Sequence, residues 1–280
     1  MSRIYHVLEK GLSRKGQKAE KDPFFRIFGE KNLPPAQEPV SKSIEAKIRK
    51  VELSAGNGSP MTIPPPDSYV AEEFRKLKTH IRHQSPAPRS ILITSAIPGE
   101  GKSTVALNLA LSFAQETNLR TILVEADLRK ASIFPELPSE GLSHYLANQT
   151  SWEEVLIHFE AQNLFVIPAG KPSPNAPQLL GTSKMSDLLK NLLQWGEATY
   201  IFIDAPPILV TSEPLIFSNW VDAILLVVMS DLAPRSSVRK AMDTIGQEKL
   251  IGVVFNQINL KPSKHYPDNY YSYYQKYFKV

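Results

Sequence analysis

The sequence of 280 residues contains no cysteine, which excludes disulfide bonds and thiolate zinc sites. It also lacks a long hydrophobic run. The longest, "AILLVVM" from Ala223 to Met229, falls far short of the roughly 20 apolar residues needed to span a bilayer. The first thirty residues contain no apolar signal core. We therefore expect a cytoplasmic protein, and a reducing compartment is consistent with the absence of cysteine.

A broad single-sign surface charge is also missing. The net charge is +4, and residues 1–60 carry all of the basic excess, with twelve Lys or Arg against seven Asp or Glu, a charge of +5. Because the rest of the chain is close to neutral, we expect no nucleic-acid partner, although the basic arm is compatible with anionic lipid or an acidic partner. Apolar residues make up 42% and charged residues 21%, as in soluble globular proteins.

The composition divides the chain into three predicted segments. Residues 1–66 are charged and interrupted by prolines and by "GNGSP" and "PPP", which block regular structure, so we predict a flexible arm. The spacing of Ile4, Val7, Leu8 and Leu12 suits one face of a short helix or a frayed terminal turn. We predict a compact domain over residues 67–260 and a flexible tyrosine-rich tail over residues 261–280.

The predicted domain alternates short apolar runs with helical patterns. The runs are "SILITS", "TILVEAD", "NLFVIPA", "YIFIDAP", "DAILLVVM" and "LIGVVFN". Continuously apolar runs are typical of strands buried on both faces, joined in parallel by crossover helices. Two helical stripes are predicted to pack in the core: Val70, Phe74, Leu77 and Ile81, and the stripe of "MSDLLKNLLQW". The expected fold is α/β, with a mostly parallel central sheet and helices on both faces.

The first run leads into "SAIPGEGKSTVALNLA", which has the features of a phosphate-binding loop, or P-loop. Its glycines let backbone N–H groups approach phosphate oxygens, and the following helix start adds positive potential. Lys102 can reach the outer phosphates of ATP, and the Ser103 hydroxyl can hold Mg²⁺. Ala96 stands where the strict pattern has glycine, so only the relaxed pattern is satisfied. The predicted nucleotide-binding residues are Pro98, Gly99, Glu100, Gly101, Lys102, Ser103 and Thr104.

Three carboxylates follow predicted strands. Glu125 and Asp127 end "LVEAD", and Asp204 ends "YIFID". Each acid alone has an ordinary alternative role as a loop cap, but three strand-end acids beside a P-loop suit Mg²⁺ binding and acceptance of a proton from an attacking hydroxyl. We predict Lys102, Glu125, Asp127 and Asp204 as catalytic residues, and Ser103, Asp127 and Asp204 as metal ligands. Arg129 and Lys130 suit either phosphate contact or plain surface cover.

The last fifteen residues, "YPDNYYSYYQKYFKV", hold six of the ten tyrosines. Polar neighbours and the lack of any period disfavour core packing. A membrane or partner contact, a stacking platform for single-stranded nucleic acid, and phosphate acceptors remain as explanations. A phosphate-handling site on the same chain favours acceptors. These are Tyr266, Tyr270, Tyr271, Tyr273, Tyr274 and Tyr277.

Together these residues resemble the bacterial tyrosine kinases, or BY-kinases, of the polysaccharide-export autokinase type. The resemblance covers roughly residues 67–280. It is carried by "EEFRKLKTHI", "SAIPGEGKST", "LVEADLRK", "GLSHYLANQ", "VIPAGKPSPNAPQLL", "FIDAPPIL" and the terminal tyrosines, in that order. It implies a P-loop NTPase-like fold and a stand-alone kinase domain.

In that family Mg-ATP binds the P-loop and the acidic strand ends, and the tyrosine tail of one subunit enters the site of a neighbour. The resemblance therefore implies a ring-like homo-oligomer, with Glu72, Arg75 and Lys78 matching the helix motif that assembles it. It also implies a cognate tyrosine phosphatase. A fused transmembrane adaptor is missing, which implies a separate membrane adaptor of the chain-length-determinant type that recruits this chain to the inner face of the membrane.

The sequence departs from the family pattern in three places. Glu125 stands where the family usually has Asp, and the extra methylene moves the carboxylate. Lys78 replaces a usual Arg and so loses bidentate pairing. Ser212 occupies a position where an acid is common.

Three functions are compatible with these features. The first is an ATP-dependent tyrosine autokinase that phosphorylates its own tail in trans and regulates exopolysaccharide or capsule synthesis or export. The second is a partition or placement ATPase, but such proteins carry an early P-loop lysine in "KGG", where this chain has Ile97, Pro98 and Gly99. The third is a catalytically silent scaffold that binds nucleotide.

Overall fold

A computed structural model describes residues 4–7, 48–51, 63–130, 133–134, 137, 140–196, 198–246 and 248–257. Most of the predicted arm and the whole of the predicted tail lie outside these ranges, so the predicted segment boundaries remain predictions. No helix within the described ranges combines the length and apolar character needed to cross a bilayer.

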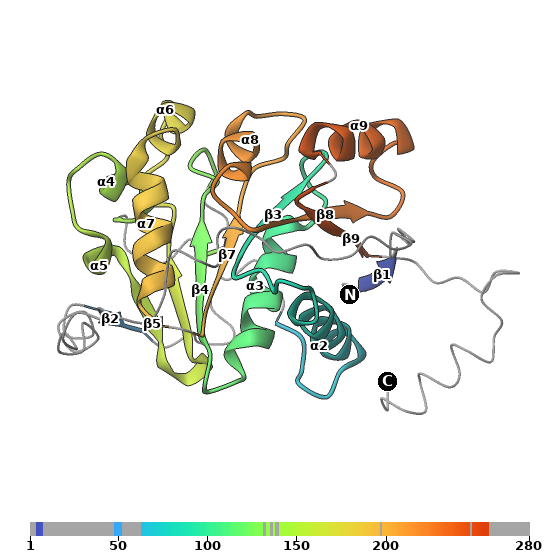
Figure 1. Cartoon of the computed structure of the whole chain (residues 1–280), viewed down its shortest axis with the longest axis horizontal. Coiled ribbons are helices and arrows are strands. Elements are labelled where there is room, and N and C mark those ends of the chain that lie inside the picture. The colour runs from blue at the N-terminus through green and yellow to red at the C-terminus, as the bar shows by residue number, and fades with distance from the viewer. Residues whose placement is uncertain are drawn as a thin grey trace, which may run out of the picture.

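The centre of the molecule is a nine-stranded sheet (Figure 1). Its strands are β1 (Ile4–Val7), β2 (Arg49–Lys50), β3 (Ser90–Ser95), β4 (Arg120–Glu125), β5 (Ile157–Phe159), β6 (Leu164–Ile167), β7 (Thr199–Asp204), β8 (Ala223–Met229) and β9 (Leu250–Asn256). The order across the sheet is β1-β9-β8-β3-β7-β4-β6-β5-β2. Only the β1–β9 and β5–β6 pairs among these strands are antiparallel. The carboxyl ends of the central strands β3, β7 and β4 therefore lie side by side at one end of the sheet. Ligands of such sheets bind at that end.

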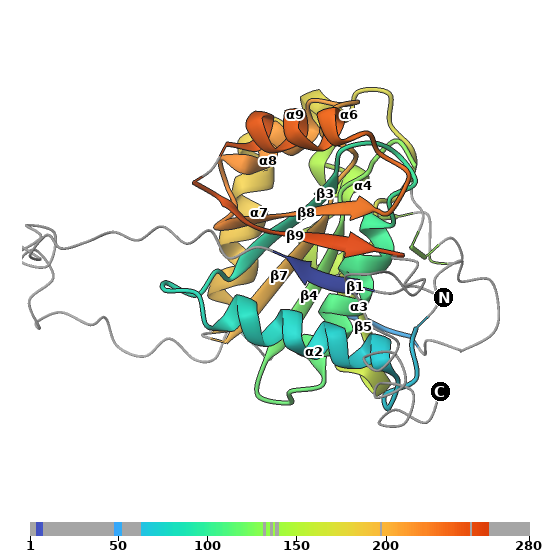
Figure 2. The ribbon, with the colours of Figure 1, turned by 90° about the vertical axis from the view of Figure 1, so that its right-hand side faces the viewer.

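Helices cover both faces of the sheet, as Figure 2 shows. They are α2 (Tyr69–Arg82), α3 (Lys102–Ala114), α4 (Leu142–Leu146), α5 (Trp152–Val155), α6 (Ala176–Leu180), α7 (Ser183–Gln194), α8 (Glu213–Ser218) and α9 (Arg235–Ile245), with a 3₁₀ turn, η2, at Glu160–Gln162. Ile91 and Ile93 of β3 pack with α2 and α3, whereas Leu92 between them packs with α7 and α8 on the opposite face. This alternation explains why a run such as "SILITS" is apolar throughout.

The first described helix, α2, illustrates how the sequence forms its elements. Ser68 caps it by accepting a hydrogen bond from the Ala71 backbone N–H at 3.2 Å. Three residues of the predicted stripe, Phe74, Leu77 and Ile81, are buried, the last two fully, and Val70 is partly buried against the same cluster. Burying each such side chain contributes roughly 1.5–3 kcal/mol to folding. The apolar face of α7 is likewise buried as predicted, and its buried residues are Met185, Leu188, Leu189 and Leu192.

The α/β fold with a mostly parallel sheet and helices on both faces is confirmed, and all six predicted apolar runs form strands. One prediction is wrong: Ile4–Val7 is not a helix but the edge strand β1, paired antiparallel with β9. The spacing of Ile4, Val7, Leu8 and Leu12 is too short a pattern to separate helix from strand, and backbone pairing of Ile4–Val7 along β9 decides here. Both β1 and β2 come from residues 1–66, and they occupy opposite edges of the sheet.

Candidate functional site

The turn between β3 and α3 has a backbone that only glycine adopts easily. Gly99 and Gly101 have positive φ angles of 88° and 85°. A Cβ atom on Gly101 would lie 2.0 Å from Nδ2 of Asn256, at the end of β9, whereas on Gly99 the nearest atom would be Leu232 Cδ2 at 3.6 Å. The two glycines therefore serve different needs, since Gly101 requires both the left-handed conformation and the missing side chain.

Glu100 stabilises this turn from the inside. Its fully buried carboxylate accepts hydrogen bonds from the backbone N–H groups of Ile97 at 2.8 Å and Met229 at 3.3 Å. Burial raises the pKa of Glu100, although these backbone hydrogen bonds oppose the rise. The Asn256 side chain donates to the Glu100 carbonyl oxygen at 3.0 Å. Glu100 thus lies in the predicted nucleotide-binding segment, but its side chain holds the loop to the end of β8, and its backbone carbonyl oxygen is held to the end of β9 by Asn256.

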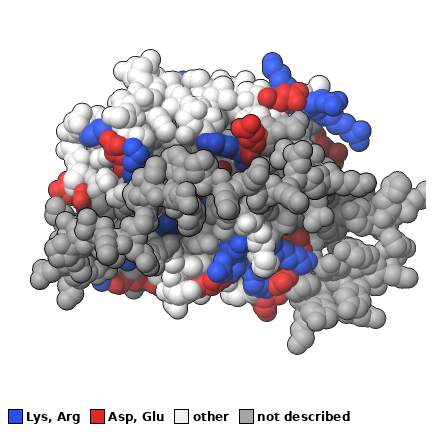
Figure 3. Space-filling view, viewed as in Figure 1, with Lys and Arg blue, Asp and Glu red and all other residues white. Residues whose placement is uncertain are grey.

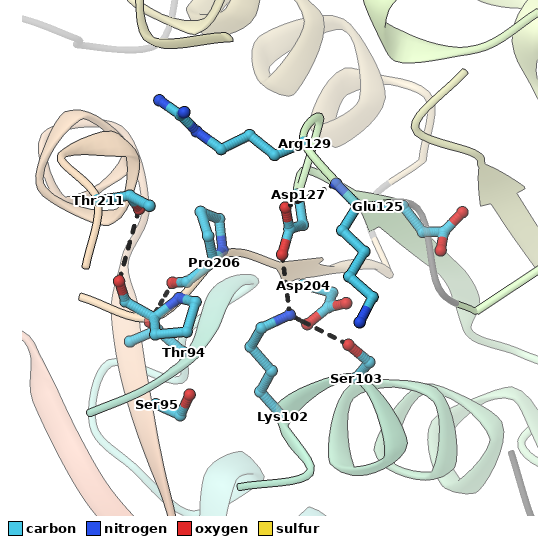
Figure 4. A network of polar contacts seen from close by, with 12 residues as sticks. Thr94, Ser95, Lys102, Ser103, Glu125, Asp127, Arg129, Asp204, Pro206 and Thr211 are labelled. Carbon is cyan, nitrogen blue, oxygen red and sulfur yellow. Dashed lines mark hydrogen bonds and ion pairs between the residues drawn. The ribbon is translucent and has the colours of Figure 1, made fainter. Parts of the chain in front are cut away.

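Lys102, the first residue of α3, lies at the centre of the site (Figure 4). Its Nζ atom is 3.3 Å from Asp127 Oδ2, 3.5 Å from Asp204 Oδ1 and 3.2 Å from Ser103 Oγ. The structure brings these four predicted residues together because β7, which ends at Asp204, lies between β3 and β4. We call Lys102, Ser103, Asp127 and Asp204 the P-loop cluster.

Burial and charge act in opposite directions within the P-loop cluster. Burial raises the pKa of Asp204, which is 1% exposed, while the ammonium of Lys102 opposes the rise. For Lys102, burial alone would lower the pKa, but Asp204 and Asp127 outweigh it and the pKa is raised. Lys102 therefore keeps its positive charge beside the two acids Asp127 and Asp204. This arrangement is suited to binding phosphates together with a divalent ion.

We expect Asp204→Asn to raise the thermal stability of the protein at neutral pH. With its pKa raised, Asp204 contributes stability that is fully present below its unfolded pKa and is lost as pH rises through its folded pKa. Asparagine stays neutral, so the variant should melt higher at pH 7, by about 2–4 °C for each kcal/mol gained. The advantage should shrink as pH falls toward 4. Exposed Asp187→Asn is the control, and a lower melting temperature for Asp204→Asn at pH 7 would contradict this expectation.

The fourth predicted catalytic residue, Glu125, does not join the P-loop cluster. Its buried carboxylate points away from Lys102 (Figure 4). It accepts hydrogen bonds from the backbone N–H groups of Ile133 at 2.7 Å and Ala169 at 3.4 Å. β4 ends at Glu125, so the strand alternation that would aim residues 125 and 127 in one direction does not continue. Glu125 instead connects β4 to the loop after β6.

An ion pair between Arg129 and Glu213 is a feature that the sequence analysis did not find. Arg129 Nε lies 2.9 Å from Glu213 Oε1, with Glu213 1% exposed. The residues are 84 positions apart, so spacing gives no signal. Ser212, which the resemblance marks as a position where an acid is common, is followed directly by Glu213. Its proximity to that position was the only clue in the sequence.

The predicted oligomer-contact residues lie on α2. Glu72 and Arg75 pair with each other at 2.7 Å and are each one-third exposed. Lys78 is less accessible and pairs with Glu116 at 2.9 Å. Burial would raise the pKa of Glu116, but Lys78 and Arg82 lower it overall. On the face seen in Figure 3, acidic and basic side chains are interspersed over α2, without a broad patch of one sign.

The donor set of the site fits a magnesium nucleotide. The described part of the chain holds no group of three His, Cys, Asp or Glu that would bind a metal by itself. Mg²⁺ in nucleotide sites typically takes only one or two carboxylates together with substrate phosphates. Asp127, Asp204 and the Ser103 hydroxyl meet that requirement. The six predicted acceptor tyrosines lie outside the described residues.

Comparisons with known proteins agree with this geometry. Residues 87–271 match a family model named ParA, described as NUBPL iron-transfer P-loop NTPase. The chain is 32% identical over 233 residues to the tyrosine-protein kinase YwqD of Bacillus subtilis, covering 80% of this chain and 95% of that protein.

Two solved structures extend the comparison. The kinase domain of the Escherichia coli tyrosine kinase Etk superposes with a TM-score of 0.66 at 25% identity, covering 78% of this chain and 92% of that domain. A chimeric protein named CapA2B2 superposes with a TM-score of 0.64 at 29% identity, covering 78% of this chain and 99% of the chimera. The sheet, the P-loop and the sequence thus point to one family.

Proposed function

The chain belongs to the bacterial tyrosine kinases, and we propose that it transfers the γ-phosphoryl group of ATP to tyrosines of its own C-terminal segment, within an oligomer and in trans. The observation that carries this proposal is the P-loop cluster, in which the Lys102 ammonium lies within 3.5 Å of both Asp127 and Asp204. Phosphoryl transfer depends mainly on positioning and on compensation of charge, and this cluster offers both.

Each residue of the P-loop cluster has a proposed part. The backbone of residues 98–104 and Lys102 bind the phosphates, while Ser103, Asp127 and Asp204 hold Mg²⁺. Bound magnesium supplies positive charge to the phosphate oxygens. The tyrosine oxygen forms a bond to the γ-phosphorus as the bond to the ADP oxygen breaks, and we assign the phenolic proton to Asp127, which is more exposed than Asp204.

The assembly and its partners follow from the same proposal. Glu72, Arg75 and Lys78 on α2 would contribute to a ring-like oligomer. Each phosphate adds about −1.5 to −2 charges, so several on one tail would repel each other and the acidic site, which favours release of the tail and disassembly. A separate membrane adaptor would recruit the kinase to the inner face of the membrane, a cognate phosphatase would reset the tail, and the cycle would regulate exopolysaccharide or capsule synthesis.

The proposal is tested by incubating the purified full chain with labelled Mg-ATP and locating phosphate by mass spectrometry. We expect phosphotyrosine in the tail, and none when all six tail tyrosines are replaced by phenylalanine. ATP hydrolysis without phosphotyrosine would support an ATPase switch, and binding without either reaction a silent scaffold. The assay is repeated with a candidate adaptor's cytoplasmic segment, because a kinase of this kind can depend on its adaptor.

We place Glu125 outside the chemical step and expect Glu125→Gln to keep the turnover number within about fivefold, because an amide oxygen still accepts one of the two backbone hydrogen bonds. Asp127→Asn, which removes the proposed proton acceptor, should lower it by about 100-fold or more. Turnover is measured by phosphotyrosine formation at saturating ATP, with thermal melting as the check on folding. If well-folded Glu125→Gln is as inactive as Asp127→Asn, the assignment of Glu125 to a positioning role is wrong.

A further inference from the structure

Arg129 is a half-exposed cation held beside the P-loop cluster. It follows Asp127 by two residues, and its Nε is paired with Oε1 of Glu213 at 2.9 Å while its own side chain remains 48% exposed. Figure 4 shows Arg129 extending from the Asp127 loop toward the segment with Thr211, with Asp127 between Arg129 and Lys102 in this view. In this view Arg129 and Lys102 lie on opposite sides of Asp127, and we place the acceptor tyrosine on the Arg129 side.

Glu213 is placed to orient this guanidinium group. Its carboxylate is 1% exposed, and its second oxygen, Oε2, is buried without a hydrogen-bond partner among the described residues. A buried carboxylate is costly unless it is paired, so Glu213 strongly favours keeping Arg129 in contact. Since Nε holds the carboxylate, the two terminal NH₂ groups of Arg129 remain as a planar fork of the kind that binds phosphate oxygens.

The charge of the surroundings limits what this fork can bind. Asp127, two residues before Arg129, shares the Lys102 ammonium with Asp204, and a phosphorylated tail would meet the repulsion of these two acids. An oriented guanidinium offers a phosphate a local attraction that a mobile lysine matches less well. The neighbouring Lys130 is also exposed and forms no ion pair with a carboxylate among the described residues, so it is the matched comparison for Arg129.

We propose that Arg129, oriented by Glu213, is a phosphate-monoester subsite on the acceptor side of the P-loop cluster, and that it binds a phosphotyrosine of a tail that has already been modified once. The inference rests on the proposed function. Six tyrosines within fifteen residues provide neighbours for such priming. The first phosphate then holds the tail while another tyrosine reaches the γ-phosphate, so successive modifications of one tail accelerate.

The subsite is tested by binding, without transfer. Fluorescent peptides of residues 266–280, unphosphorylated or phosphorylated at one of the six tyrosines, are titrated with the full chain in Mg-ADP and followed by anisotropy. We expect at least one singly phosphorylated peptide to bind about tenfold tighter than the unphosphorylated peptide, equivalent to about 1.4 kcal/mol. In Arg129→Ala the two peptides should bind with about equal affinity. In Arg129→Lys and Glu213→Gln the phosphorylated peptide should bind less than about threefold tighter.

Lys130→Ala is the matched control, since it removes a neighbouring exposed charge and should keep the preference. Arg129→Lys guards against a folding defect, and melting temperatures are recorded for all variants. An equal loss in Lys130→Ala, or a preference that survives Arg129→Ala, overturns the proposal. So does weaker binding of ATP, but not ADP, in Arg129→Ala with an unchanged peptide preference, since the phosphate bound would then be that of the nucleotide.

Autophosphorylation gives a second readout. Intact-mass spectra of the full chain during reaction with Mg-ATP should show multiply phosphorylated chains beside unmodified ones, whereas Arg129→Ala should accumulate singly phosphorylated chains. These two readouts distinguish failure of the phosphate subsite from failure of the proposed kinase activity. Phosphotyrosine formation without any peptide preference refutes the subsite alone, and an Arg129-dependent preference without phosphotyrosine formation refutes the kinase activity alone.

Discussion

Lys102→Met is expected to lower phosphotyrosine formation by at least about 1,000-fold. The substitution removes the Nζ atom that lies within 3.5 Å of Ser103, Asp127 and Asp204. Loss of one preorganised group that stabilises transition-state charge costs about 100- to 1,000-fold, and here the two acids also lose their shared counterion. Their repulsion of the incoming triphosphate adds to the loss.

The measurement separates binding from chemistry. We expect a weaker affinity for ATP, measured by calorimetry, together with the lower rate at saturating ATP. Lys190→Met is the control, because Lys190 on α7 is 68% exposed and pairs only with Asp187 at 3.6 Å in the described structure. If Lys102→Met retains more than a tenth of the wild-type rate, the P-loop cluster is not the site of transfer.

Gly101→Ala is expected to destabilise the protein by about 2–5 kcal/mol and to remove measurable nucleotide binding. A left-handed conformation costs a residue with a Cβ about 1–2 kcal/mol. The new Cβ would also lie 2.0 Å from Asn256 Nδ2, so Asn256 must leave the Glu100 carbonyl oxygen. Leaving such a buried acceptor unsatisfied costs about 1–3 kcal/mol more. Urea denaturation gives the free energy of unfolding, and calorimetry gives the nucleotide affinity.

Two glycines separate backbone strain from the steric clash. Gly99→Ala and Gly246→Ala also place alanine at positive φ, but the nearest atom to a Cβ at Gly99 is 3.6 Å away and none lies within 4 Å at Gly246. Gly99→Ala should cost only about 1–2 kcal/mol. Gly246 has φ 81° and ψ 158°, a region that only glycine adopts easily, so Gly246→Ala should cost about 1–3 kcal/mol from backbone strain without a clash. Asn256→Ala removes the clashing side chain, so the double variant with Gly101→Ala should be less destabilised than the sum of the two single variants. Strict additivity would show that the contact with Asn256 is not the cause.

The central strands could be predicted because each is a continuous apolar run. The run "YIFID" is an example, because its side chains on both faces of β7 lie in the interior. The short edge strands could not be predicted in this way. β5 has three residues and β2 has two, so neither contains two full periods of the strand alternation, and pairing with other strands defines them.

The site was predictable where it depends on strand ends. The P-loop motif places Lys102 in the turn and helix that follow β3, Asp204 ends the adjacent strand β7, and the parallel order brings the ends of these strands together. Side-chain direction was not predictable. Glu125 turns toward the backbone of Ile133 and Ala169, which follows from where β4 stops, and Arg129 meets Glu213 only because the chain folds back over 84 residues.

The positions of β1 and β2 limit how copies of this chain can assemble. One caps β9 and the other caps β5, and they present only four and two residues of backbone at the outer margins. Such short margins give a second copy little to extend by strand addition. Within the described residues, contacts between copies in the proposed oligomer are therefore left mainly to side chains of helices and loops, which can separate again without breaking backbone hydrogen bonds between strands.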